Sequence, residues 1–259
     1  MLEEWVGTAL VDRGSHPVEL TQAGQAFLPR AKEVLDKLEE SRHTARAASA
    51  EATTTLNFLT TQVVSLTFFP GWFRRALGPK RIETINLTTS SLRGCEQAML
   101  QRSAHFLLCH HFRGMPWQLG ESDFTSIVVE NDRLLPVSAT DSTGRAIYVL
   151  SQANADKVPL LAYEPEAGFG RIFRSAFEPE RLSSFREVAS SHLALLLGLA
   201  LEGRGVAWVP ETVIRHDMLA GRLLEAGGPE WSVPMQIRLF RPVERLSAVA
   251  EEFWERVSA

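Results

Sequence analysis

The sequence lacks the features of exported and membrane-spanning proteins. Its start, Met1 to Glu4, is acidic where a secretory signal needs positive charge followed by an apolar stretch. Its longest apolar run, Leu193 to Leu201, is interrupted by Gly198 and is far shorter than the roughly 20 residues of a membrane-spanning helix. We therefore expect a cytoplasmic protein that has no membrane partner.

Cysteine and basic charge are also scarce. The two cysteines, Cys95 and Cys109, cannot build a disulfide framework, and a bridge between them is not expected in a reducing compartment. The sequence has 27 lysine and arginine residues against 31 acidic ones, a net charge of −4, which excludes binding to nucleic acid through bulk positive charge. Any contact with DNA must be local.

Motifs of catalysis and metal binding are missing. There is no nucleophile elbow, Walker loop, H-E-x-x-H or paired C-x-x-C, and the glycine pairs at 168–170 and 203–205 lack the third glycine of a dinucleotide loop. Cys109, His110 and His111 are consecutive on an expected strand, where neighbouring side chains point to opposite faces, so the three cannot share one metal ion. We predict no enzyme activity, no metal and no cofactor, with an α/β enzyme kept as a third alternative.

The pattern near the start predicts a long helix from Thr21 to about Ala50, with Thr21 as its N-cap and a bend at Pro29. Its apolar or small positions step alternately by four and three residues, the spacing of a helix that pairs with a partner helix. The alternative is a helix packed on its own domain. We predict dimerisation through Phe27, Ala31, Val34, Leu38 and Ala45, with Ser41 and Ala48 continuing the same spacing.

At 259 residues the chain exceeds one typical core, and beyond this helix short apolar strands alternate with helices, as in a parallel α/β sheet. We expect two similar halves, hence two subdomains. The expected strands are 56–61, 82–88, 104–109, 134–138, 160–163, 185–188 and 206–209. The expected helices are 65–77, 91–102, 170–177, 190–202 and 244–257.

Polar side chains follow several of these strands and precede helices. A helix start offers free N–H groups and partial positive charge, so several starts that converge on one crevice predict a site for a small anion or carboxylate. The alternative is that these residues are only N-caps. One of the two adjacent histidines is expected to point into the same crevice. The predicted effector-binding residues are Thr61, Ser65, Thr89, Ser91, His110, Ser191 and His192.

Two stretches make the chain resemble LysR-type transcriptional regulators. They are 2–24, with LEEWVG, LVDR and LTQAG, and 203–223, with GRGVAWVPE followed by GRL. The resemblance implies an α/β fold in which a long dimerisation helix precedes a two-subdomain, type II periplasmic-binding-protein-like effector domain with a small-molecule effector in its cleft. It implies a remnant of a winged helix-turn-helix at 1–20, a linker helix at 21–51 and an effector domain at 56–259, divided into about 56–133 with 238–259 and about 134–237.

The front of the chain departs from that family, which places two helices and most of the recognition helix before the point that matches Met1. Roughly thirty residues are expected to be absent, so this sequence alone should not read an operator specifically. Residues 1–51 hold six basic and nine acidic side chains, and Arg13 at the wing is the one credible contact to the DNA backbone. Either the coding sequence starts further upstream, or the chain is a truncated or degenerate relative.

Three further stretches, 135–141, 159–163 and 205–208, resemble the hypochlorite-responsive branch of the family, which is associated with methionine oxidation. Met99, Met115, Met218 and Met235 do not align with the sensing methionines of that branch, whereas Phe169 and His192 stand at two of them. We predict a LysR-type regulator that is a homodimer or homotetramer, binds DNA through the full-length protein and senses a small anion or an oxidant. The alternative is a small-molecule-binding module without specific DNA binding.

Overall fold

The computed structural model describes residues 2–12, 14, 18–49, 55–77, 84–151, 157–178 and 186–259. The chain divides into two compact units, one up to Ala52 and one that holds nearly all of the rest, from Thr53 to Ala259. In the described ranges no helix is both long enough and apolar enough to cross a bilayer.

The N-terminal unit is a short helix, a two-stranded hairpin and one long helix: α1 (Leu2–Val6), β1 (Val11–Asp12), β2 (Glu19–Leu20) and α2 (Gln22–Ser49). The predicted long helix is confirmed, and so is its cap, because the Thr21 hydroxyl oxygen accepts the amide of Gly24 at 3.0 Å. A glycine is required at position 24 because a Cβ there would collide with the carbonyl of Leu10. The helix continues through Pro29.

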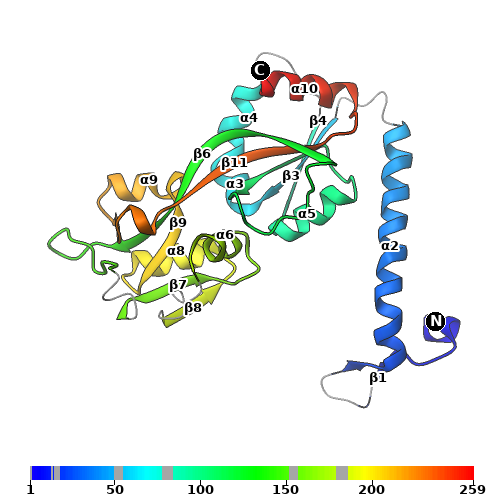
Figure 1. Cartoon of the computed structure of the whole chain (residues 1–259), viewed down its shortest axis with the longest axis horizontal. Coiled ribbons are helices and arrows are strands. Elements are labelled where there is room, and N and C mark those ends of the chain that lie inside the picture. The colour runs from blue at the N-terminus through cyan, green and yellow to red at the C-terminus, as the bar shows by residue number, and fades with distance from the viewer. Residues whose placement is uncertain are drawn as a thin grey trace. The chain divides into compact units, whose positions relative to one another are not determined.

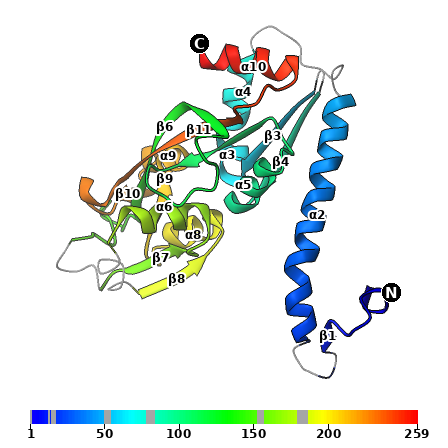
Figure 2. The same cartoon turned by 45° about the vertical axis from the view of Figure 1, so that its right-hand side comes forward.

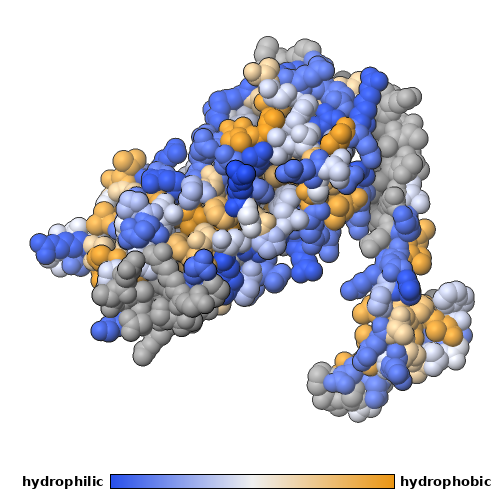
Figure 3. Space-filling view, viewed as in Figure 1, coloured by the Kyte–Doolittle hydropathy of each residue, from blue (hydrophilic) through white to orange (hydrophobic). Residues whose placement is uncertain are grey.

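The expected dimer seam lies partly on the surface of α2. Val34 and Leu38 are 59% and 61% exposed, and Phe27 and Ala31 are half-buried. Figure 3 shows hydrophobic side chains on the surface of this unit. The side chain of Ala45 and all of Arg13 lie outside the described part of the chain.

The second unit is built on one twisted sheet with strand order β4-β3-β5-β11-β6-β9-β7-β8, in which β10 also pairs with β6. Strand β3 runs parallel to β4 and β5, and β7 runs parallel to β8 and β9. The strands are β3 (Thr55–Thr61), β4 (Thr84–Ser90), β5 (Phe106–His111), β6 (Phe124–Ala139), β7 (Pro159–Tyr163), β8 (Arg186–Ser190), β9 (Val206–Pro210), β10 (Leu223–Glu225) and β11 (Val233–Pro242).

Two parallel halves are therefore joined by the long strands β6 and β11, which pair antiparallel with each other (Figure 1). Helices α4 and α10 lie together near β3, and α6 and α8 lie near β7 and β8 in both views (Figure 2). This confirms the expected fold of two α/β subdomains. The helices are α3 (Gln62–Thr67), α4 (Phe69–Leu77), α5 (Leu92–Leu100), α6 (Gly168–Ala176), α8 (Leu193–Leu201), α9 (Glu211–Leu219) and α10 (Ala248–Ser258).

Each half has its own apolar core. In the first, Phe58 is buried among the rings of Phe69, Phe73, Phe106 and Phe253, whose centroids lie 5.2 to 5.5 Å from its own. A second cluster fills the other half between β7, β9 and α8. A third cluster joins the two halves, because it packs Leu92 and Met99 of α5 with Ile172 of α6 and Trp208 of β9.

The structure corrects several expected boundaries. The helix expected at 65–77 is two helices that meet at Phe68, because Pro70 has no N–H to donate to the carbonyl of Leu66, four residues earlier. The strand expected at 104–109 is shifted to Phe106–His111, so both histidines lie within it. The strand expected at 134–138 is only the end of β6, and neither β11 nor α9 was expected.

Candidate functional site

A cavity of about 410 Å³ lies where the two halves of the second unit face each other. We call it the polar cavity. Six of the seven predicted effector-binding residues line it, on segments that are far apart in the sequence: Thr61, Thr89, Ser91, His110, Ser191 and His192. Ser65 does not line it, and the Ser65 hydroxyl instead donates to the carbonyl of Gln62 at 2.7 Å.

The polar side chains of the polar cavity differ in whether they make a helix-capping hydrogen bond. The Ser91 oxygen caps α5 by accepting the amide of Gly94 at 3.1 Å. Thr61 and His192 stand directly before α3 and α8, but neither makes a side-chain cap hydrogen bond. The capping alternative therefore accounts for Ser91 and leaves Thr61 and His192 unexplained.

His110 is held by a buried network at the back of the polar cavity. Its Nε2 lies 3.0 Å from Oδ2 of Asp132, and Asp132 also accepts hydrogen bonds from the Thr212 hydroxyl at 2.7 Å, the Thr212 amide and the Arg133 amide. Burial opposes ionisation of Asp132, but the hydrogen bonds from His110, Thr212 and Arg133 outweigh it, and the pKa of the carboxyl is lowered. Asp132 is therefore a carboxylate, and Nε2 of His110 is the donor to it.

This assignment leaves the other ring nitrogen facing the cavity without a partner. Nδ1 of His110 and the hydroxyl of Tyr163 are buried and make no hydrogen bond in the described part of the chain, although both residues line the polar cavity. The Phe169 ring stands between them, with its centroid 5.1 Å from the ring of His110 and 5.3 Å from that of Tyr163. Burial raises the pKa of Tyr163, so its hydroxyl stays protonated and can donate.

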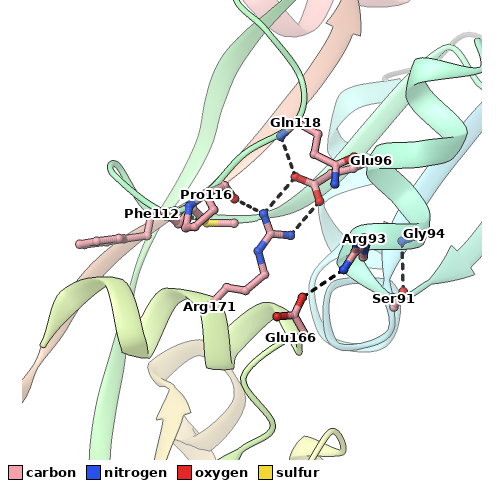
Figure 4. A network of polar contacts seen from close by, with 10 residues as sticks. Ser91, Arg93, Gly94, Glu96, Phe112, Pro116, Gln118, Glu166 and Arg171 are labelled. Atoms are coloured by element: carbon pink, nitrogen blue, oxygen red, sulfur yellow. Dashed lines mark hydrogen bonds and ion pairs between the residues drawn. The ribbon is translucent and has the colours of Figure 1, made fainter. Parts of the chain in front are cut away.

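The two walls of the cavity are clasped by ion pairs between α5 and α6 (Figure 4). The guanidinium of Arg171 on α6 binds both carboxylate oxygens of Glu96 on α5, at 2.7 and 3.2 Å, and also donates to the carbonyl of Pro116. Glu96 is fully buried and accepts a further bond from the Gln118 amide. Arg93 on α5 and Glu166, in the turn before α6, make a second, exposed pair at 3.3 Å.

Other motifs of the sequence have structural explanations. A Cβ at Gly170 would collide with the carbonyl of Glu164, and Gly203 has a φ of +72°, so both glycines are required by the backbone. Cys95 and Cys109 are free and buried, and burial raises the pKa of the Cys95 thiol to about 11 and that of Cys109 well above its usual range. No group of three metal-ligating side chains occurs in the described ranges.

Sequence reasoning missed four residues of this region: Tyr163, Asp132, Arg171 and Glu96. Polar residues at strand ends, such as Ser91, were selected as candidates. Tyr163 is also a polar residue at the end of a strand, so the same signal could have identified it. Asp132 carried no such signal, because it lies within a strand that was not expected.

Comparison with known proteins agrees with this architecture. The LysR substrate binding domain family matches residues 49–259. The chain belongs to the LysR-type family of transcriptional regulators. It is 27% identical to the HTH-type transcriptional regulator YjiE of Escherichia coli K12, over 99% of this chain and 82% of YjiE. It is also 27% identical to the HTH domain-truncated transcriptional regulator QseD of Escherichia coli O157:H7, over 93% of this chain and 96% of QseD.

Among solved structures, full-length HypT from Salmonella typhimurium, described as a hypochlorite-specific LysR-type transcriptional regulator, is 27% identical. It matches with a TM-score of 0.65 over 99% of this chain and 84% of its own. The regulatory domain of HypT with bound bromide is 25% identical and matches with a TM-score of 0.64 over 79% of this chain and 93% of its own. The homologues are regulators rather than enzymes, and LysR-type regulators bind DNA and small effectors and form oligomers.

Proposed function

We propose that the polar cavity is the effector site of this LysR-type regulator and that its ligand is a small anion. The observation that carries this proposal is the pair of buried groups without partners, His110 Nδ1 and the Tyr163 hydroxyl. A buried polar group without a hydrogen bond costs about 1 to 3 kcal/mol, so a ligand that supplies the missing bonds is bound favourably. The other proposed contacts are Thr61, Thr89, Ser91, Ser191 and His192.

The chemistry of the walls supports an anion of low charge. Among the described residues, no aspartate, glutamate, lysine or arginine lines the polar cavity, whereas the first residues of α5, α6 and α8 do. The Tyr163 hydroxyl stays protonated and can donate to the anion as it stands. The bromide-bound structure of the HypT regulatory domain is a precedent in a relative.

An oxidant signal is the alternative that the hypochlorite-specific relative favours. Direct oxidation of a side chain in the polar cavity has little support here, because no methionine or cysteine is among its lining residues. Phe169 and His192, which we align with two sensing methionines, line the cavity instead. Both thiols have raised pKa values and are poor nucleophiles. We therefore favour ligand binding over side-chain oxidation.

The N-terminal unit supports a role in dimerisation and DNA positioning. We propose that Phe27, Ala31, Val34, Leu38 and Ala45 pair α2 with a second copy. Replacing Val34 and Leu38 by glutamate should then lower the sedimentation mass, and an unchanged mass would exclude this seam.

For DNA we propose that residues 1–259 by themselves bind weakly and with strong salt dependence, because α1 spans only Leu2–Val6 and Arg13 is the one contact to the DNA backbone that the sequence suggests. The truncated relative QseD is consistent with a regulator of this kind. Tight, sequence-selective mobility shifts by residues 1–259 alone would contradict this.

The effector proposal is tested by a thermal-shift screen of halides and small carboxylates. A ligand at a hundredfold excess over its dissociation constant stabilises the fold by about 2.7 kcal/mol. Thr61→Val and Ser191→Ala should reduce the thermal shift. Ser65→Ala is the matched control, because the Ser65 hydroxyl lies on α3 outside the polar cavity and donates to the carbonyl of Gln62. If a stabilising anion acts equally on all variants, the site lies elsewhere.

A further inference from the structure

A second cavity, of about 850 Å³, is lined by the end of β5, the segment that follows it, and strands β6 and β11. We call it the basic cavity. It shares no lining residue with the polar cavity, and the adjacent residues His110 and His111 line one cavity each. None of the proposed effector contacts reaches it.

Arg238 is the unusual residue of the basic cavity. This half-buried guanidinium donates from Nε and Nη2 to the Ser126 hydroxyl at 3.1 and 3.0 Å and from Nη1 to the side-chain oxygen of Gln236 at 2.8 Å. All three bonds go to neutral oxygens, and no carboxylate pairs with Arg238 in the described ranges. Because arginine has five N–H donors, two remain for a ligand.

Two other arginines of the second unit, the half-buried Arg171 and the buried Arg241, are each paired with a carboxylate. Arg171 binds Glu96 at 2.7 Å and Arg241 binds Glu251 at 2.7 Å. A desolvated cation without a counter-charge is costly, and a fork of free guanidinium donors matches a carboxylate. Arg238 therefore has what an anion-binding residue needs, a positive charge without a carboxylate partner among the described residues, and free N–H donors.

The remaining charges of the basic cavity favour an anion as well. Arg133 is paired with Glu211 at 2.9 Å, and Asp132 is committed to His110 and Thr212. Arg113 and Glu121, both exposed, are the other charged lining residues, and they balance each other. Arg238 supplies the excess positive charge.

An aromatic wall stands beside Arg238. The rings of Trp117 and Phe240 lie 4.9 Å apart, and His111 packs against both at 5.1 and 5.6 Å. Burial and the positive charge of Arg238 lower the pKa of His111 to about 4, so this ring is uncharged at neutral pH and acts as part of the apolar wall. Flat rings beside a cation suit a ligand with an apolar body and an anionic head.

We propose that the basic cavity is a second small-molecule site, which takes an organic anion with its carboxylate on Arg238 and a flat apolar body against Trp117 and Phe240. This proposal does not depend on the effector proposed for the polar cavity, so an experiment can contradict one proposal and leave the other standing.

The test uses benzoate as the probe and tryptophan fluorescence as the readout, with benzyl alcohol and acetate as probes that lack the charge or the ring. Benzoate should bind saturably at millimolar concentrations, and each of the other two should bind about tenfold more weakly or not at all. Arg238→Gln should weaken benzoate binding about tenfold or more, and Arg238→Lys should weaken it less. Trp117→Phe should bind benzoate but lose most of the fluorescence change.

Two controls make the result decisive. Arg133→Gln removes a guanidinium from the same cavity that is already paired, so it should change benzoate affinity little. Tyr163→Phe reports on the polar cavity. If Tyr163→Phe abolishes binding while Arg238→Gln does not, benzoate occupies the polar cavity and the proposal is wrong. Absence of saturable binding to the wild type, or unchanged affinity in a folded Arg238 variant, overturns it as well.

Discussion

The polar and basic cavities of the second unit are built partly from neighbouring residues, yet different groups line them. His110 and His111 are consecutive on β5, and the alternation of a strand sends them to different cavities. His110 is tied to a buried carboxylate and has a free nitrogen, whereas His111 is packed among rings near a guanidinium. Residue type alone therefore does not fix the role of a histidine; the groups around it do.

The two cavities also differ in how they are closed. The polar cavity has walls on both halves, clasped by the buried Arg171–Glu96 pair, while the basic cavity is formed around the joining strands β6 and β11 and has no such clasp. We expect changes at the clasp and at Asp132 to alter the polar cavity strongly, and changes near His111 to act on the basic cavity.

The largest effect is expected from breaking the clasp. Arg171→Met leaves the carboxylate of Glu96 buried without a counter-charge, so the free energy of unfolding should fall by about 3 to 5 kcal/mol, as measured by urea denaturation. Arg93→Met, which breaks the exposed pair with Glu166, should cost less than about 1 kcal/mol. Adding Glu96→Gln to Arg171→Met should recover part of the loss; no recovery would mean that charge is not the cause.

A smaller loss is expected from Asp132→Asn, which alters the wall between the cavities. The new amide group would face the hydrogen-bond donors of Thr212 and Arg133, so we expect a loss of about 2 to 3 kcal/mol. Glu211→Gln is the control, since Glu211 pairs with the half-exposed Arg133. Equal stability of Asp132→Asn and wild type would exclude the buried network as a structural element.

The pH dependence of stability should report on His111. The pKa of His111 is lowered from 6.5 to about 4 in the folded chain, so the unfolded chain binds more protons between these values. Stability should therefore fall as the pH drops from 6.5 towards 4, by up to about 1 kcal/mol per pH unit. His111→Gln should flatten this slope, and a variant with the wild-type slope would show that His111 is not its source.

The smallest effect on stability is expected from Tyr163→Phe, which removes a hydroxyl that has no partner. The fold should be unchanged or gain up to about 1 kcal/mol, because an unsatisfied buried group is lost. Binding of an anion in the polar cavity should nevertheless weaken, as measured by the thermal shift. A clear loss of stability would mean that the hydroxyl has a partner in the fold, and unchanged anion binding would remove Tyr163 from the site.

Local patterns of the sequence were enough to predict much of the fold. The spacing of apolar residues predicted α2 to within one residue at each end, and Thr21 was recognisable as its cap because capping depends on residues only three apart. Strands such as Pro159–Tyr163 and Val206–Pro210 were predicted because buried parallel strands are continuous apolar runs. The rule that ligands bind beyond strand ends selected six of the residues that line the polar cavity.

Only the tertiary structure decided the rest. Residues Glu130 to Arg133 are polar and resemble a loop, yet they are strand because β11 pairs with them from about a hundred residues away. The same pairing places Asp132 next to His110, brings Arg238 beside Ser126 and forms a wall of the basic cavity. Such contacts depend on the packing of distant segments, and no local pattern encodes them. The sequence could therefore select residues that line the polar cavity, but not the buried groups there, His110 Nδ1 and the Tyr163 hydroxyl, that make no hydrogen bond in the described part of the chain.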